Sequence, residues 1–144
     1  MKKFKFQLQK VLEVREIHLK RCQKELAELD EQKRKADKIL RALEQKSQRF
    51  AEKVACQDRG CAEELEWRQQ YLQSLFDAVE RQKDHIIKIE KEREKQRQTL
   101  LKAHRNQKIL ENLRQQAYDN YLEAAQHLDQ NLMDELANLN SLSK

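Results

Sequence analysis

The stretch CQDRGC, Cys56–Cys61, holds the only glycine of the chain, Gly60, and lies between two long segments with a helical hydrophobic repeat. Glycine readily adopts the left-handed conformation that often follows a helix end. Glu63 and Glu64 beyond it suit the positive end of a second helix, although no Ser, Thr or Asp stands at the expected N-cap. We therefore predict that one helix ends and another begins here, with Gly60 in a left-handed conformation.

The segment before this stretch places apolar residues every 3.5 positions on average, in alternating steps of four and three. Most positions of this register are apolar, as in the seam along which the helices of a coiled coil pack. The positions are Leu8, Leu12, Arg15, Leu19, Cys22, Leu26, Leu29, Lys33, Ala36, Leu40, Leu43, Ser47, Phe50 and Val54.

A second seam of the same period follows the glycine. Its positions are Leu65, Arg68, Leu72, Leu75, Val79, Gln82, Ile86, Ile89, Arg93, Gln96, Leu100, Ala103, Gln107 and Leu110. Extending the first register past Val54 would instead bury Glu64, His85, Glu92 and Asn106. The phase of the repeat therefore changes within the stretch around Gly60.

The two seams predict an all-α fold, an antiparallel two-helix coiled-coil hairpin that forms a single domain over residues 1–144. We expect helix 1 at about residues 3–58, a tip at about 59–62 and helix 2 at about 62–140. Residues whose numbers sum to about 122 should then face each other, such as Ala36 and Ile86. The charges of Lys33 and Arg93 are expected to reach water from the seam. A single rod that pairs with another copy remains an alternative.

Helix 2 should be the longer helix, with no partner in the chain for residues beyond Tyr118. This extension nevertheless carries an apolar stripe made of Tyr121, Ala125, Leu128, Leu132, Leu136 and Leu139. An amphipathic helix with nothing over its apolar face indicates a missing partner. A frayed tail that serves only solubility or self-association is the alternative.

Composition excludes several classes of protein. The 144 residues include one glycine and no proline, which argues against barrels, sandwiches and phosphate-binding loops. The cationic start is followed by no apolar run typical of a secretory signal, and no segment has the roughly 20 apolar residues that span a bilayer. Cys22, Cys56 and Cys61 are expected as free thiols, with Cys22 in the core.

The charged and titratable residues indicate neither an enzyme nor a metal protein. Lys and Arg number 30 against 25 Asp and Glu, for a net charge of +5. A basic rod that binds nucleic acid is the alternative from a different class, but the bases are interleaved with acids and not with aromatic residues. No histidine lies four residues from another, and no nucleophile–base pair is evident. We expect no catalysis, no metal and no cofactor.

Two stretches resemble the flagellar export protein FliJ. They are FKFQLQKVLEVREI, Phe4–Ile17, at the start of the chain, and QQYLQSLFDAVERQ, Gln69–Gln82, beyond the tip. The resemblance implies an antiparallel coiled coil similar to the central stalk of rotary ATP synthases, and a role in flagellar type III export. It also implies three partners: the hexameric export ATPase (FliI), the membrane export gate protein (FlhA) and export chaperones.

The resemblance assigns binding of the export gate to one stripe early in helix 2. The matching positions are Tyr71, Leu75, Ala78 and Gln82, where glutamine replaces the imidazole of the family. Binding of the ATPase ring is expected at the end that holds the termini, through Phe4, Phe6, Leu8, Tyr121, Leu128, Leu132, Leu136 and Leu139.

The sequence thus predicts a stalk that links the export ATPase to the gate and escorts chaperones. We expect it in the cytoplasm, peripheral to the inner membrane at the flagellar base, without nucleic acid or a small-molecule substrate. The corresponding stalk of a virulence type III secretion system remains an alternative.

Overall fold

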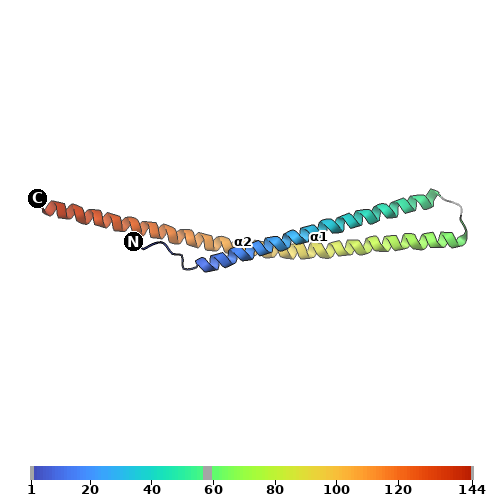
Figure 1. The fold of residues 1–144 in the computed structure, drawn as a ribbon, viewed down its shortest axis with the longest axis horizontal. Coiled ribbons are helices and arrows are strands. Elements are labelled where there is room, and N and C mark those ends of the chain that lie inside the picture. Colours follow the sequence, from blue (N-terminus) through green and yellow to red (C-terminus); the bar gives the residue numbers. More distant parts are fainter. Residues whose placement is uncertain (1, 57–59, 144) are drawn as a thin grey trace. The chain divides into compact units, whose positions relative to one another are not determined.

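Two long helices make up almost all of the chain. In the computed structural model, which describes residues 2–56 and 60–143, α1 spans Gln9–Cys56 and α2 spans Ala62–Leu142 (Figure 1). No strand occurs within these described ranges. The predicted all-α architecture is confirmed, and the packing of α1 against α2 is consistent with a helical hairpin.

The helices form because nothing in their sequences interrupts them and their ends carry suitable charges. Neither helix contains glycine or proline, the two residues that most disfavour a helix interior. Glu63 and Glu64 lie in the first turn of α2, and Lys53 lies in the last turn of α1. Each charge thus opposes the partial charge of its helix end.

The start of α1 differs from the sequence prediction, because residues 2–8 are not helical. We call this segment the N-terminal strap. Its apolar residues Phe4, Phe6 and Leu8 alternate with polar ones, a period typical of extended backbone. The first helical turn forms only where the amide of Leu12 donates to the carbonyl of Leu8, at 2.9 Å. The predicted start at about residue 3 is therefore wrong by about two turns.

The region between the helices agrees with the prediction in part. Helix α2 begins at Ala62, as expected, and ends at Leu142, close to the expected residue 140. The predicted end of helix 1 at residue 58 and the predicted start of the tip at 59 lie outside the described residues. Gly60 has no positive φ, so the expected left-handed conformation is wrong. The backbone conformation at Gly60 is therefore open to residues that have a side chain.

Contacts divide the chain into two compact units, and each helix contributes to both. Unit 1 consists of Met1–Arg21 and Leu100–Lys144, and unit 2 of Cys22–Thr99. The buried apolar residues of both units lie on the predicted seams, which confirms the 3.5-residue repeat. They are Leu12, Leu19 and Ala103 in unit 1, and Cys22, Ala36, Leu75, Val79, Ile86 and Ile89 in unit 2.

Unit 2 shows the antiparallel register directly. Ala36 of α1 is packed in a buried cluster with Ile86 and Ile89 of α2. The cluster agrees with the expectation that facing residues have numbers that sum to about 122. The seam position Leu65, in contrast, is 46% exposed, so packing of the seam weakens at the start of α2.

Polar pairs cross the seam in the middle of unit 2. Lys33 Nζ lies 3.3 Å from Glu90 Oε1, and Arg93 Nε lies 2.6 Å from Asp30 Oδ1. Gln96 donates a hydrogen bond to Glu25 from the same seam. The side chains of Lys33 and Arg93 are 28% and 43% exposed, in agreement with the expectation that their charges reach water. The sequence analysis did not foresee that each of them also pairs with an acid on the facing helix.

Candidate interaction surfaces

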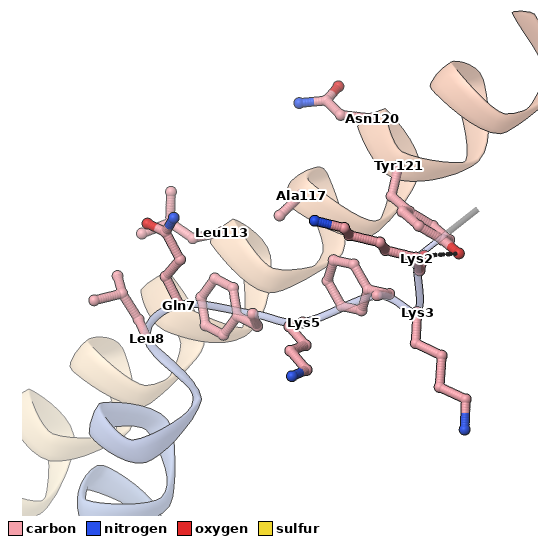
Figure 2. A pocket seen from close by; sticks show the side chains of 11 residues that line it. Lys2, Lys3, Lys5, Gln7, Leu8, Leu113, Ala117, Asn120 and Tyr121 are labelled. Carbon is pink, nitrogen blue, oxygen red and sulfur yellow. Dashed lines mark hydrogen bonds between the residues drawn. The ribbon is translucent and has the colours of Figure 1, made fainter. Parts of the chain in front are cut away.

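The N-terminal strap folds back onto α2 through an aromatic cluster in unit 1. The ring of Phe4 contacts Tyr118 edge-on at 5.2 Å between centroids, and contacts Tyr121 at 5.6 Å. The hydroxyl of Tyr121 donates a hydrogen bond to the backbone carbonyl of Lys2, at 2.9 Å (Figure 2). Tyr121 was expected to lack a partner within the chain, and this was wrong because the non-helical strap reaches it.

An open groove lies between the strap and α2. Its volume is about 1180 Å³, and its walls combine apolar side chains with three lysines. Phe6 and Leu8 of the strap and Leu113 and Ala117 of α2 supply apolar surface. Lys3 and Lys5 point away from α2 in Figure 2, so their ammonium groups are open to solvent. The groove suits an apolar group that carries negative charge beside it.

Beyond the strap, α2 continues as a helix with an uncovered apolar stripe. We call residues 122–142 the C-terminal overhang. Their leucines on the stripe are all more than half exposed, namely Leu128, Leu132, Leu136 and Leu139 at 51–62%. Ala125 is half-buried. The overhang thus presents a run of unpacked apolar side chains along α2, a feature typical of an interaction surface.

A second aromatic cluster lies in unit 2, near the ends of both helices. The rings of Phe50 and Tyr71 meet edge-on at 4.6 Å, across the two helices. Trp67 stacks on Tyr71 at 5.6 Å with an interplanar angle of 3°, although its side chain is 61% exposed. The sequence analysis did not single out Trp67. Its position four residues before Tyr71, on the same helix face, was the available signal.

The four residues predicted to bind the export gate lie on one face of α2 but differ in accessibility. Leu75 is buried, at 6% exposure, while Tyr71 and Ala78 are half-buried. Gln82 is also half-buried, and its amide donates to the carbonyl of Ala36 at 3.0 Å. Tyr71 therefore offers the largest accessible side chain of the stripe, and Leu75 and Gln82 face α1.

The residues predicted for the ATPase ring fall into two groups. Phe4, Phe6 and Tyr121 are half-buried in the contact between strap and α2, and Leu8 is 41% exposed beside them. The leucines of the overhang are uncovered. The structure thus brings the first group together and leaves the second group as a separate stripe on the same helix.

Metal-binding clusters, cysteine pairs and membrane-spanning stretches are each absent from the described ranges, 2–56 and 60–143. No group of three or more His, Cys, Asp or Glu side chains is placed to hold a metal ion within them. Cys22 is buried, Cys56 and Cys61 are exposed, and none of these three cysteines forms a disulfide. Among the described residues, neither helix has a stretch apolar enough to span a bilayer.

The chain matches the family model of the flagellar FliJ protein over residues 4–144. The chain belongs to the FliJ family. The match includes the strap, both helices and the overhang. No curated protein and no solved structure shows a significant match. Membership in the FliJ family makes the chain a component associated with flagellar type III protein export, in a family whose role is not catalytic.

Proposed function

We propose that the chain is the stalk that links the hexameric export ATPase to the membrane export gate. The observation that carries the proposal is the uncovered leucine stripe of the overhang in a protein of the FliJ family. The family's role in export is not catalytic, so the chain would act through its contacts. Two separate surfaces, one in each unit, are what a linking protein requires.

The ATPase contact is assigned to the end with the termini. Leu128, Leu132 and Leu136 provide apolar area on the overhang, and Phe4 and Tyr121 hold the strap beside it. A helix with an apolar stripe of this kind can bury the stripe against the apolar lining of a ring's pore. The strap keeps Phe6 and Leu8 beside Leu113 and Ala117, on the part of α2 that precedes the stripe.

The gate contact is assigned to Tyr71, with Leu75, Ala78 and Gln82 on the same face. Because Leu75 is buried and Gln82 is bonded to α1, these two side chains position the surface while Tyr71 supplies the accessible ring. Large aromatic side chains in preformed clusters are frequent anchors of protein interfaces. Trp67 enlarges this anchor.

The stalk would act by transmitting a conformational difference. If the ring binds the overhang more tightly in one nucleotide state than in another, the difference in binding free energy biases the state of the gate. Escort of export chaperones would add further binding partners to the same chain. We expect the protein in the cytoplasm, at the membrane-bound export apparatus.

The test is ATP turnover by the purified export ATPase with and without the full chain. We expect the chain to promote ring formation and turnover, and the double variant L128D/L132D to lose this effect. Met133→Asp is the matched control, because it adds one charge at an exposed apolar residue outside the stripe. Unchanged turnover with the native chain would refute the assignment to the ATPase.

A further inference from the structure

The overhang and the groove beside the strap are complementary in charge and in apolar spacing. The overhang carries Glu123, Asp129, Asp134 and Glu135, and residues 122–142 hold no lysine or arginine, with His127 as their one histidine. The strap carries Lys2, Lys3 and Lys5 and no acid. Attraction between such segments favours their association and fixes its orientation. The overhang cannot fold back onto its own groove, because α2 is one helix through Leu142.

We propose that the overhang of one copy docks in the strap groove of a second copy, and that the two copies form a symmetric antiparallel dimer. A two-fold axis makes each copy give its overhang and receive the other's, so the interface is closed. The proposal concerns the chain alone and does not depend on its partners in export. It uses only surfaces within unit 1.

The spacing of side chains sets the register of this dimer. Groove residues Leu113, Ala117 and Tyr121 recur every four residues, as do overhang residues Leu136, Leu132 and Leu128. An antiparallel arrangement places Leu132 opposite Ala117, with the other two pairs beside it. In this central pair the large side chain of Leu132 meets the small side chain of Ala117, which lets the two helices interdigitate. The two-fold axis falls between Ala124 and Ala125, whose small side chains allow close approach of the helices.

Charge disfavours the simpler alternative, in which two overhangs pair about Leu132. That register would place Asp129 of each copy opposite Glu135 of the other, between two acidic segments. In the proposed register, Asp129 instead lies opposite Asn120, next to the strap lysines, and Glu135 lies opposite Arg114. Opposite charges across exposed pairs each contribute up to about 1 kcal/mol, and like charges cost a similar amount. The offset register is therefore preferred.

The dimer would occupy the same leucines that are assigned to the ATPase ring. Export partners and the second copy would then compete for one stripe. The dimer thus shields apolar surface that would otherwise be exposed in the free protein, and it dissociates when a tighter partner is present.

The first test is the mass of the full chain by sedimentation equilibrium at rising concentration. We expect a shift from the monomer of 17.4 kDa to twice that mass at micromolar concentrations. Leu132→Asp should weaken dimerisation by about 100-fold or more, because symmetry buries the new charge twice. Met133→Asp, on the neighbouring residue outside the stripe, should change it by less than about threefold. A monomer at all concentrations would overturn the proposal.

The second test measures the register with single cysteines in a chain whose three native cysteines are replaced by serine. Ala125→Cys places two thiols next to the two-fold axis and should form a disulfide-linked dimer rapidly. Leu132→Cys places them far apart and should crosslink at least about tenfold more slowly, since thiols must approach closely to bond. Faster crosslinking at position 132 would show that the overhangs pair with each other and would refute docking in the groove. Circular dichroism of each variant checks that the helices are intact.

Discussion

The side-chain amide of Gln82 on α2 donates a hydrogen bond to the backbone carbonyl of Ala36 on α1, with 3.0 Å between the two atoms. Ala36 is itself buried in the cluster with Ile86 and Ile89. A satisfied polar group at a seam position favours one register, because sliding the helices would leave the amide without its acceptor. Gln82 therefore has a structural role that is independent of any partner.

Replacing Gln82 with alanine should lower the free energy of unfolding by about 1 kcal/mol, the usual net contribution of one hydrogen bond. The measurement is urea unfolding followed by circular dichroism. Gln98→Ala is the control, since Gln98 is exposed and bonds only to Glu94 within its own helix. Its effect should stay within about 0.5 kcal/mol. Equal losses of unfolding free energy in the two variants would show that the hydrogen bond across the seam does not stabilise the fold.

The strap should be held mainly by Phe4. Phe4→Ala removes the ring that packs on Tyr118 and Tyr121, so the strap should leave α2 while the helices stay folded. Because the strap carries Lys2, Lys3 and Lys5, limited trypsin digestion reports its release directly. We expect cleavage after Lys5 to accelerate at least about tenfold, as local opening exposes the bond.

Tyr121→Phe is the conservative partner of that variant. It keeps the ring contact and removes only the hydrogen bond to the carbonyl of Lys2. A loss of about 1 kcal/mol corresponds to roughly fivefold faster cleavage at most. If trypsin cut both variants at the native rate, the contacts of Phe4 and Tyr121 would not stabilise the strap on α2.

The seams could be predicted from the sequence because burial in a coiled coil follows a single period. Leu12, Ala36 and Ile86 are buried where the 3.5-residue repeat places them. The strap was missed because Phe4, Leu8 and Leu12 recur every four residues, as on one face of a helix, while Phe4, Phe6 and Leu8 also follow a period of two. Only the contact with Tyr118, a residue distant in sequence, decides between the two conformations.

The two surfaces differ in how far they could be predicted. The overhang follows from a difference in helix length, so its exposed leucines were evident as a stripe without a partner. The stacking of Trp67 on Tyr71 within α2 and the pairing of Arg93 with Asp30 across the seam depend on the rotamers of these side chains. Periodicity carries no information about these choices.

Gly60→Ala should be tolerated, contrary to what a left-handed glycine would predict. Since φ at Gly60 is not positive, alanine can adopt the native backbone, and it restricts the unfolded chain. A Cβ atom would approach Glu64 Oε2 to 3.0 Å, and this flexible carboxylate can move away. We expect a change between zero and a gain of about 0.5 kcal/mol in urea unfolding. A loss above about 1 kcal/mol would instead indicate a strained turn.

The ion pair between Asp30 and Arg93 should contribute little to stability despite its short distance of 2.6 Å. Both side chains are more than a third exposed, so solvent screens the attraction. A double-mutant cycle with Asp30→Ala and Arg93→Ala should give a coupling energy below about 1 kcal/mol, reduced further in 1 M salt. A larger coupling that persists in salt would mean that the pair behaves as a buried one.

Trp67 should be important for binding but not for folding. Its side chain is 61% exposed, so Trp67→Ala should cost less than about 1 kcal/mol in unfolding free energy. Its stacking on Tyr71 presents a rigid aromatic surface, and truncation should weaken binding of the soluble domain of the gate protein by about tenfold or more. Ile87→Ala, at a side chain that is 48% exposed elsewhere on α2, is the control and should bind normally.

Binding can be read from Trp67 itself, because it is the only tryptophan of the chain. In a titration with a gate domain whose own tryptophans are replaced, burial of the indole should shift its emission to shorter wavelength. Tyr71→Ala removes the ring on which Trp67 stacks, so it should weaken binding at least as strongly as Trp67→Ala. Tight binding without any change in emission would place the gate contact away from this cluster, because an indole at the interface cannot keep its solvent-exposed spectrum.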